Sequence, residues 1–192
     1  MKKYKSKSKI LVVLVSVVGL LGIGFSQANL AAMVMPFGSD EDIEYASNLW
    51  SQMEQGGFNS KPAILYVGGP PHGPVREVLE GFIDGHRVIV KRNYGGEGVS
   101  VQSVEGNRTN FLKAITIMAK RDAGYDTENG DWFWAKYKAD GSLHINDKNI
   151  QLAGRIAKGM NTGCIVCHQA ASGNDLVFAH NKEANADMTI IE

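Results

Sequence analysis

From Ile43 to Met53, apolar residues recur along this chain with a helical period. Ser39 is followed by three acids and then by apolar residues at three- and four-residue spacing from Ile43 to Met53. A serine N-cap, acids in the first turn and an apolar stripe together predict a helix over 40–55.

The middle of the chain alternates between runs of β-branched or aromatic residues and turn-forming residues. Such runs are typical of strands, and they predict strands over 63–67, 86–94, 114–121 and 132–138. A short helical piece over 75–80 is expected after the proline- and glycine-rich stretch 68–74, and Asn129-Gly130 predicts a hairpin turn. The expected fold class is therefore α+β, an antiparallel β-sheet with flanking helices.

Two further patterns concern the second half of the chain. Leu152, Ile156 and Met160 form one stripe, which predicts a helix over 147–160 that ends at the following glycines. Alternation places Trp132 and Trp134 on one face of their strand, where both are expected to pack in the core.

The first residues form a targeting segment. Five lysines precede an apolar run over 10–25, and the small residues Ser26 and Ala28 follow it. This order predicts a secretory signal peptide over 1–28 and a periplasmic protein. An uncleaved membrane anchor is the alternative, although the run is shorter than the roughly 20 residues of a relaxed span.

The remaining chain divides into a linker over 29–38, one domain over 39–182 and a poorly ordered tail over 183–192. The leader holds five lysines and no acid, so its removal leaves 15 basic and 20 acidic residues, a net charge near −5. A mildly acidic domain is not expected to bind nucleic acid.

The strongest chemical signal is the segment Cys164-Ile165-Val166-Cys167-His168, which holds the only two cysteines. Two thiols at this spacing can bond to the two vinyl groups of a haem, and the next histidine then becomes an axial iron ligand. The sequence predicts one covalent haem c held by Cys164, Cys167 and His168, with His168 as the metal ligand. The predicted sheet would thus carry a C-terminal haem-attachment segment.

Three other interpretations of the motif stay open: a redox dithiol, half of a zinc site and a short disulfide. A thioredoxin-like pair opens a helix early in its domain, whereas this pair lies near the end of the chain. A zinc site would need two further ligands.

The second axial position of the iron has no obvious ligand. Met188 is the only methionine after the motif and lies in the expected tail. The upstream candidates are Met53, Met118, Met160, His72, His86 and His144. Methionines in helical or strand stripes are usually core residues. We therefore expect five-coordinate iron with an open face, which suits binding of a small molecule better than simple electron transfer.

Five segments taken together resemble the cytochrome P-460 family, which includes the cytochromes c′-beta: 84–91, 117–122, 130–132, 164–168 and 175–178. The resemblance covers roughly residues 40–180. It implies a β-sheet-rich, often dimeric, periplasmic monohaem cytochrome with five-coordinate iron. Some members oxidise hydroxylamine and carry a lysine covalently tied to the haem, whereas the c′-beta members bind nitric oxide and similar gases without that link.

The resemblance implies that Lys91 faces the haem. From alternation alone, Val88 and Val90 would face the core and Lys91 would face solvent.

In hydroxylamine-oxidising members a distal acid lies four residues before the lysine of the next strand, which is Thr116 here, and a distal arginine falls near Ala63. A threonine is no base near neutral pH. Glu97, Glu105 and Asp122 are nearby acids that we expect at the surface.

The favoured function is an exported c-type monohaem cytochrome with five-coordinate iron that binds a small nitrogen-oxide ligand such as nitric oxide. One alternative is a hydroxylamine or nitric oxide oxidoreductase with a lysine-cross-linked haem, for which no catalytic residue is assigned. The second is a periplasmic electron-transfer cytochrome with a redox protein partner. A homodimer is expected from the family, and membrane contact only if the leader is uncleaved.

Overall fold

The computed structural model describes residues 35–178 and 189–191. The predicted signal peptide and most of the predicted linker lie outside these residues, as does Met188. Within the described ranges, no helix combines the length and apolar character needed to cross a membrane.

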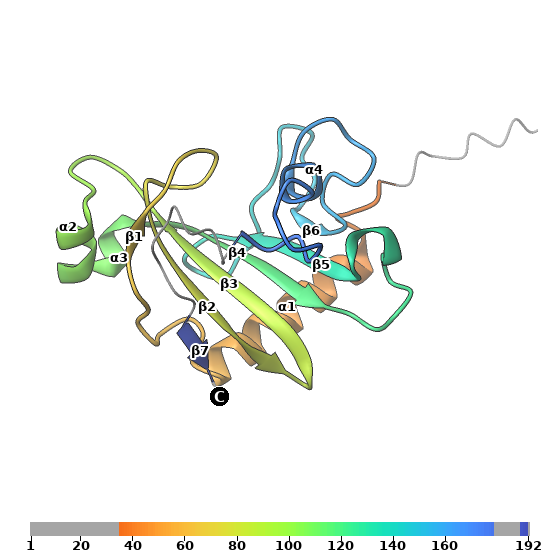
Figure 1. Ribbon diagram of the computed structural model, residues 1–192, viewed down its shortest axis with the longest axis horizontal. Coiled ribbons are helices and arrows are strands. Elements are labelled where there is room, and N and C mark those ends of the chain that lie inside the picture. Colours follow the sequence, from red (N-terminus) through yellow and green to blue (C-terminus); the bar gives the residue numbers. More distant parts are fainter. Residues whose placement is uncertain (1–34, 179–188, 192) are drawn as a thin grey trace, which may run out of the picture. The chain divides into compact units, whose positions relative to one another are not determined.

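The domain is built on a mixed sheet whose main path is antiparallel (Figure 1). Its strands, in spatial order, are β1 (Tyr66–Val67), β2 (Val75–Ile83), β3 (His86–Tyr94), β4 (Leu112–Lys120), β5 (Trp132–Tyr137) and β6 (Ala153–Gly154). A last strand, β7 (Thr189–Ile191), pairs in parallel with β2. The predicted α+β class with an antiparallel sheet is confirmed.

Helix α1 (Asp40–Gln55) covers one face of the sheet and has the bounds that the sequence predicts. Ser39 and Asp42 form a reciprocal capping box, in which the Ser39 hydroxyl accepts from the Asp42 N–H at 3.1 Å. The helix buries Leu49 and Met53 against this face of the sheet. The Tyr137 hydroxyl donates to the Ala46 carbonyl at 2.8 Å and joins the last long strand to the helix.

The other face of the sheet is covered by the C-terminal part of the chain (Figure 1). Ile156, Ile165 and Val177 pack there on strand residues that include Trp132 and Trp134. The remaining short helices are α2 (Val101–Gly106), α3 (Arg108–Phe111), the 3-10 turn η1 (Thr127–Asn129) and α4 (Cys164–His168). The sheet is thus the middle layer, and both of its faces are buried.

Burial on both faces explains why the helix expected over 75–80 is wrong. These residues open strand β2, in which Val75, Val78 and Leu79 are all buried. A strand buried on both faces loses the alternation that identifies strands in a sequence. The strand expected over 63–67 is paired only at Tyr66 and Val67.

The helix expected over 147–160 is also wrong. The chain there forms β6 and a series of turns, with Gly154 at φ +110° and Ala157 at φ +66°. Gly154 is paired with both Trp134 and Phe37. These long-range pairings outweigh a weak local preference for helix.

The predicted domain boundaries need two changes. Phe37 is 3% exposed and packs in the domain, although the sequence places it in the linker. Residues 189–191 form β7 with Ile191 buried, although the sequence predicts a poorly ordered tail there.

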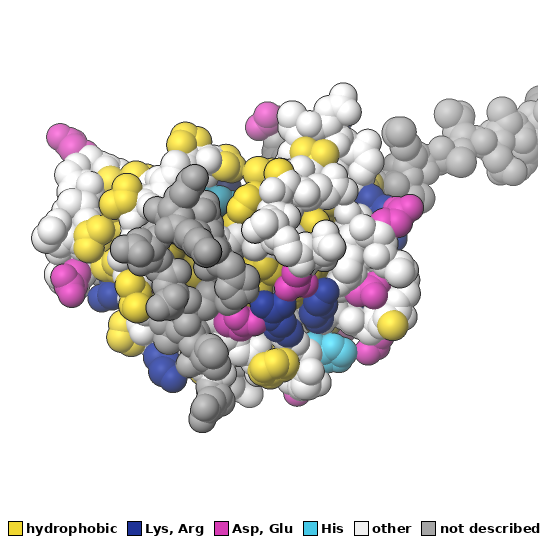
Figure 2. Space-filling model, viewed as in Figure 1, with side chains coloured by type: hydrophobic (Ala, Val, Ile, Leu, Met, Phe, Trp, Pro, Cys, Tyr) yellow, Lys and Arg dark blue, Asp and Glu magenta, His cyan; other side chains and the backbone are white. Residues whose placement is uncertain are grey.

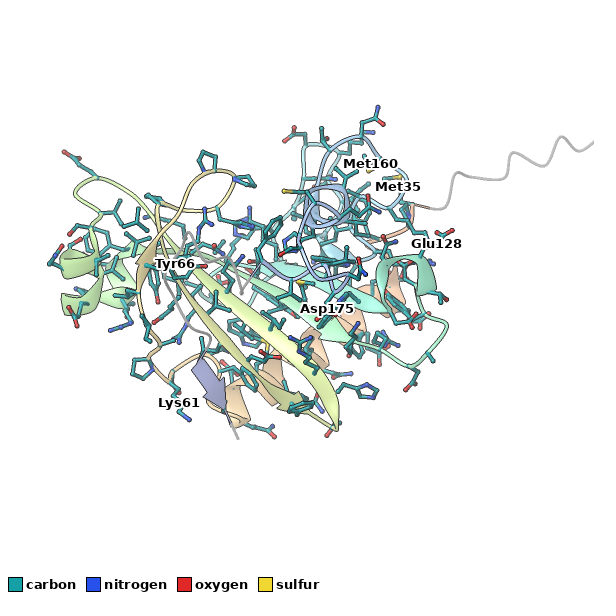
Figure 3. All side chains as sticks on the ribbon, viewed as in Figure 1. Met35, Lys61, Tyr66, Glu128, Met160 and Asp175 are labelled. Carbon is teal, nitrogen blue, oxygen red and sulfur yellow. The ribbon has the colours of Figure 1, made fainter. Side chains whose placement is uncertain are left out.

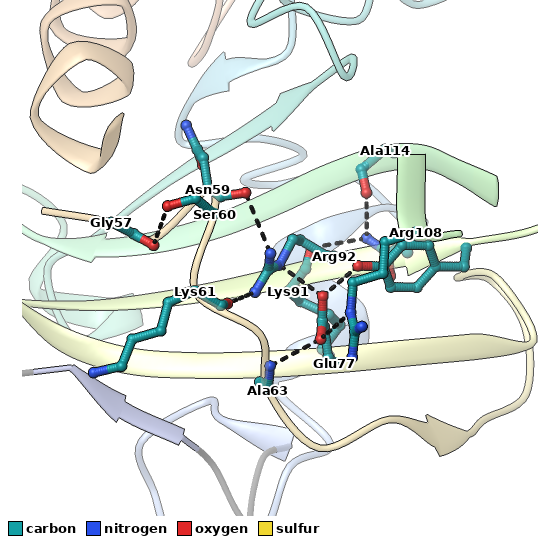
Figure 4. Close-up of polar contacts among 12 residues, drawn as sticks. Gly57, Asn59, Ser60, Lys61, Ala63, Glu77, Lys91, Arg92, Arg108 and Ala114 are labelled. Atoms are coloured by element: carbon teal, nitrogen blue, oxygen red, sulfur yellow. Dashed lines mark hydrogen bonds and ion pairs between the residues drawn. The ribbon is translucent and has the colours of Figure 1, made fainter. Parts of the chain in front are cut away.

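A buried carboxylate ties several elements together on the α1 face (Figure 4). Glu77 in β2 lies 3.0 Å from the Arg92 guanidinium and 3.3 Å from that of Arg108. It also accepts from the Tyr94 hydroxyl and from the Ala63 N–H. One carboxylate therefore joins β2, β3, α3 and the segment before β1.

We predict that Glu77→Gln lowers the free energy of unfolding by about 3 kcal/mol or more, because it leaves two guanidinium groups without their shared carboxylate. Urea denaturation measures the effect. Glu128→Gln, at a side chain 81% exposed that pairs with Lys158, is the control and should cost less than about 1 kcal/mol. Equal effects of the two substitutions would contradict a structural role of the buried cluster.

Candidate functional site

The strand pairings arrange one face of the sheet in rows of side chains. Val78, Lys91, Thr116 and Lys136 lie opposite one another across β2, β3, β4 and β5. Directly opposed residues of antiparallel strands point to the same face. The next row on this face holds Ile89, Met118 and Trp134.

The predicted haem-attachment motif packs on the same face of the sheet. Cys164, Cys167 and His168 form α4, whose Ile165 is 2% exposed and is packed into the apolar cluster on the sheet. Gly163 precedes the helix at φ +128°, and a Cβ there would lie 2.3 Å from the Ala157 Cβ. Only glycine allows this close approach, which sets the turn at Ala157 against the start of the motif.

The His168 ring is held by three neighbours. Its Nδ1 lies 2.6 Å from the Leu176 carbonyl oxygen and donates to it. Trp134 and Phe178 pack on the ring edge to face, with centroids at 4.8 and 5.1 Å. Because Nδ1 carries the proton, the unshared pair of Nε2 is left for a metal.

The pKa of His168 is lowered to about 4, chiefly by burial, while the Leu176 hydrogen bond acts against this and Lys91 adds to it. The imidazole is therefore neutral at physiological pH, the form that binds a metal ion.

The backbone of Leu176, whose carbonyl accepts from His168, has φ +61°, a conformation that non-glycine residues rarely adopt.

The segment after the motif is fastened to the sheet at Asp175, which Figure 3 labels beside the strands. Its carbonyl accepts from the Trp132 indole N–H at 3.0 Å. Its carboxylate pairs with Arg87 and lies 3.6 Å from the Lys120 ammonium. Basic and acidic side chains accordingly lie together on this face in Figure 2. These contacts hold the Leu176 carbonyl within reach of His168.

A cavity of about 380 Å³ separates the motif from the sheet. Its walls include Cys164, Cys167 and His168, and both thiols are free. Apolar side chains form most of the remaining wall, among them Val78, Ile89, Met118, Trp134, Leu152, Ile156, Val177 and Phe178. Cavities of about 300–1,000 Å³ with apolar walls and few polar groups are typical of cofactor sites. The residues present fit a covalently attached haem.

Lys91 opens onto the same cavity and is only 9% exposed. The solvent-facing position expected from alternation is therefore wrong, because the C-terminal segment covers the face that Lys91 shares with Ile89. Burial, with a smaller effect of Arg76, lowers the pKa of Lys91 to about 8. A covalent bond between this amine and haem stays a prediction of the oxidoreductase alternative.

Thr116 lines the cavity. It occupies the position at which the family resemblance places a catalytic acid. The Thr116 hydroxyl accepts from the Asn93 amide at 3.2 Å. Glu97, Glu105 and Asp122 are exposed, as expected. Ala63 is absent from the cavity wall, and its N–H donates to Glu77. Among the described residues lining the cavity, none is an aspartate or glutamate.

Two of the candidate sixth ligands, His72 and Met118, line the cavity. Met53 is buried on the α1 face instead, and Met160 is 37% exposed. His86 and His144 are absent from the described cavity lining. The pKa of His72 is lowered to about 3, mainly by burial and then by Lys91 and Arg76.

Several residues of this site have no separate signal in the sequence. Trp134 is predicted as core and is buried, but it also contacts His168 and lines the cavity. Leu176 and Phe178 act through a backbone carbonyl and an aromatic contact, which residue type alone does not reveal. As for the zinc interpretation, residues 35–178 and 189–191 contain no group of three or more potential metal-ligating His, Cys, Asp or Glu side chains.

Comparison with known proteins gives one match. The model of the family described as Cytochrome P460 matches residues 74–179, which is more than half of the chain. The matched stretch contains strands β2 to β6 and the whole motif. No curated protein and no solved structure matches the chain.

We predict a pH-dependent stabilisation from Lys91→Met in the haem-free chain, made with Cys164→Ala and Cys167→Ala. The folded pKa of Lys91 is about 8 and its ordinary value is 10.5. Between these values the unfolded chain binds more protons, so wild-type stability rises with pH across this window. At pH 7 the substitution should therefore raise the free energy of unfolding by about 2–3 kcal/mol.

Denaturation at several pH values measures this difference, which should shrink above pH 8 and vanish above pH 10.5. Lys138→Met, at an exposed position after β5, is the control and should have a pH-independent effect within about 0.5 kcal/mol. A pH-independent effect of Lys91→Met would show that the amine is not desolvated.

Proposed function

Because the chain belongs to the cytochrome P460 family and is thus a haem-binding cytochrome, we propose that it is an exported c-type monohaem protein that binds nitric oxide or a similar small nitrogen-oxide ligand at five-coordinate iron. The observation that carries the proposal is the cavity at the Cys164–His168 motif. Its wall is largely apolar, and its described residues include no carboxylate.

The chain's own residues suit each part of this role. The Cys164 and Cys167 thiols would hold the haem covalently, and His168 Nε2 would be the iron ligand from the protein. The hydrogen bond from Nδ1 to Leu176 fixes the ring orientation and increases the basicity of Nε2. When bound, haem iron supplies an open coordination position for a small ligand.

Binding is favoured over oxidation because the two reactions need different groups. Nitric oxide is a small neutral molecule whose binding moves no proton, so an apolar wall is sufficient. Oxidation of hydroxylamine releases protons, and a nearby base must accept them. Thr116 occupies the position at which the family resemblance places that base, and its hydroxyl cannot serve.

Export and assembly belong to the same proposal. The leader over 1–28 would bring the chain to the periplasm, where c-type haem is attached. A homodimer, a redox protein partner and a membrane anchor formed by an uncleaved leader stay predictions.

A second candidate function is a hydroxylamine or nitric oxide oxidoreductase with haem cross-linked to Lys91. One observation favours it: Lys91 is buried in the cavity wall, and its pKa of about 8 leaves part of the amine neutral near physiological pH. A neutral amine is the nucleophilic form that bond formation needs.

An electron-transfer role would instead require a sixth iron ligand, for which His72 and Met118 are the candidates in the described cavity wall.

We predict that the ferrous holoprotein has a high-spin c-type absorption spectrum that changes when nitric oxide is added. Cys164→Ala should remove one of the two thioether bonds, which the pyridine haemochrome spectrum and intact mass detect. Val166→Ala, at a side chain in the same helix that is 37% exposed, is the control and should keep both bonds. A low-spin ferrous spectrum without added ligand would contradict the open iron site.

We predict that Lys91→Ala leaves the Soret position unchanged and alters the intact mass only by the substitution itself. Lys136→Ala, in the same row of the sheet, is the matched control. The oxidoreductase alternative predicts the opposite: a strongly red-shifted Soret band in the wild type, abolished by Lys91→Ala and kept in Lys136→Ala. The comparison therefore separates the two functions.

A further inference from the structure

A second hollow, of about 340 Å³, adjoins the haem cavity. The segment that begins at Tyr66, labelled in Figure 3, forms one wall of it, and Arg76 forms another. The two hollows share His72, Lys91 and His168. Whatever occupies the second hollow is therefore next to the predicted iron ligand.

Arg76 is half-buried, and its guanidinium has few partners among the described residues. Its Nε donates to the Gly73 carbonyl at 2.9 Å. Its Nη2 is buried and has no hydrogen-bond partner among the described residues. The guanidinium groups of Arg87, Arg92 and Arg108 each pair with a carboxylate. Within residues 35–178 and 189–191, neither Arg76 nor Lys91 has an acidic side chain in ion-pair range.

The guanidinium is also held in place. A Cβ on Gly68 would lie 2.6 Å from Arg76 Cζ, so the backbone at Gly68 packs directly on the guanidinium plane. Together with the Gly73 hydrogen bond, this contact fixes the group before any ligand arrives. Preorganised donors bind a ligand at a lower entropic cost.

The charges in this hollow are unbalanced. Arg76 disfavours the charge of the buried Lys91 amine, and both cations disfavour a charge on His72. Burying cations without counter-charges is costly. No aspartate or glutamate occurs among the described residues of this hollow, so the group that balances the charge must come from outside these residues.

We propose that Arg76 and Lys91 form a binding site for a planar oxyanion. A guanidinium binds two oxygens of such a group through parallel N–H donors, and the lysine adds a point charge. Two sources carry this chemistry: a propionate carboxylate of the bound haem, and a free nitrogen oxyanion such as nitrite. The inference rests on the proposed function only in that haem occupies the adjoining cavity.

The test compares wild-type holoprotein with Arg76→Gln in three measurements. Nitrite titration of the ferric protein, followed by absorbance, reports anion affinity. Nitric oxide titration of the ferrous protein reports binding of a neutral ligand at the iron. Resonance Raman bands of the haem propionates report hydrogen bonding to their carboxylates.

Arg121→Gln is the matched control, because Arg121 stacks on Tyr45, a residue of α1, at 3.9 Å and is absent from the described lining of both hollows. Far-UV circular dichroism and the thermal midpoint establish that each variant is folded. If Arg76→Gln does not fold, Gly68→Ala takes its place, since it displaces the guanidinium without removing it.

A free oxyanion as the ligand predicts that nitrite affinity falls about tenfold or more in Arg76→Gln, with nitric oxide affinity unchanged. A propionate as the ligand predicts shifted propionate bands in Arg76→Gln and no change in nitrite affinity. The control should show neither effect. A folded variant with unchanged nitrite affinity and unchanged propionate bands would overturn the oxyanion site. Failure of the wild type to bind nitric oxide would instead refute the proposed function. The conclusion about the oxyanion site, which rests on nitrite affinity and the propionate bands, would still hold.

Discussion

Burial of the sheet on both faces is the constraint on which the rest of this domain depends. Helix α1 covers one face and the C-terminal segment covers the other, so polar residues in the middle of the sheet, among them Glu77, Lys91 and Arg92, are taken out of water. On the α1 face the cost is offset within the chain, because Glu77 forms an ion pair with Arg92 and accepts hydrogen bonds from Arg108 and Tyr94. On the opposite face Lys91 is buried and Arg76 is half-buried, and neither pairs with a carboxylate among the described residues. The two faces therefore differ in kind: one is a closed structural core, and the other is completed by a ligand.

Helix α4, which holds the predicted haem-attachment motif, depends on that second face. A helix of five residues has little stability of its own. Ile165 and Val177 bury their side chains in the apolar cluster, and Asp175 joins the following segment to Trp132 and Arg87. These contacts place the Leu176 carbonyl at the Nδ1 of His168. The orientation of His168, the predicted metal ligand, is thus set by the packing on the sheet.

The polar groups of the cavity determine which ligands suit it. Its described wall contains lysine, histidine and threonine side chains but no carboxylate. Such a wall favours neutral molecules and anions, and its described residues offer no carboxylate to accept the protons that an oxidation would release. The proposed gas binding and the proposed anion site at Arg76 rest on the same feature, which is a wall that holds cations and, among its described residues, no carboxylate.

The sequence by itself determined what local residue order controls: the capped helix over 40–55, the strand over 86–94 and the spacing of Cys164, Cys167 and His168. In each, the signal lies within a few residues of the structure it specifies. Only the tertiary structure decided the secondary structure of residues 75–80 and 147–160, where pairing between distant strands outweighs the local preference for helix. It also decided the environment of Lys91. Alternation along β3 separates two faces of a strand, but only the segment packed on each face determines whether that face meets water.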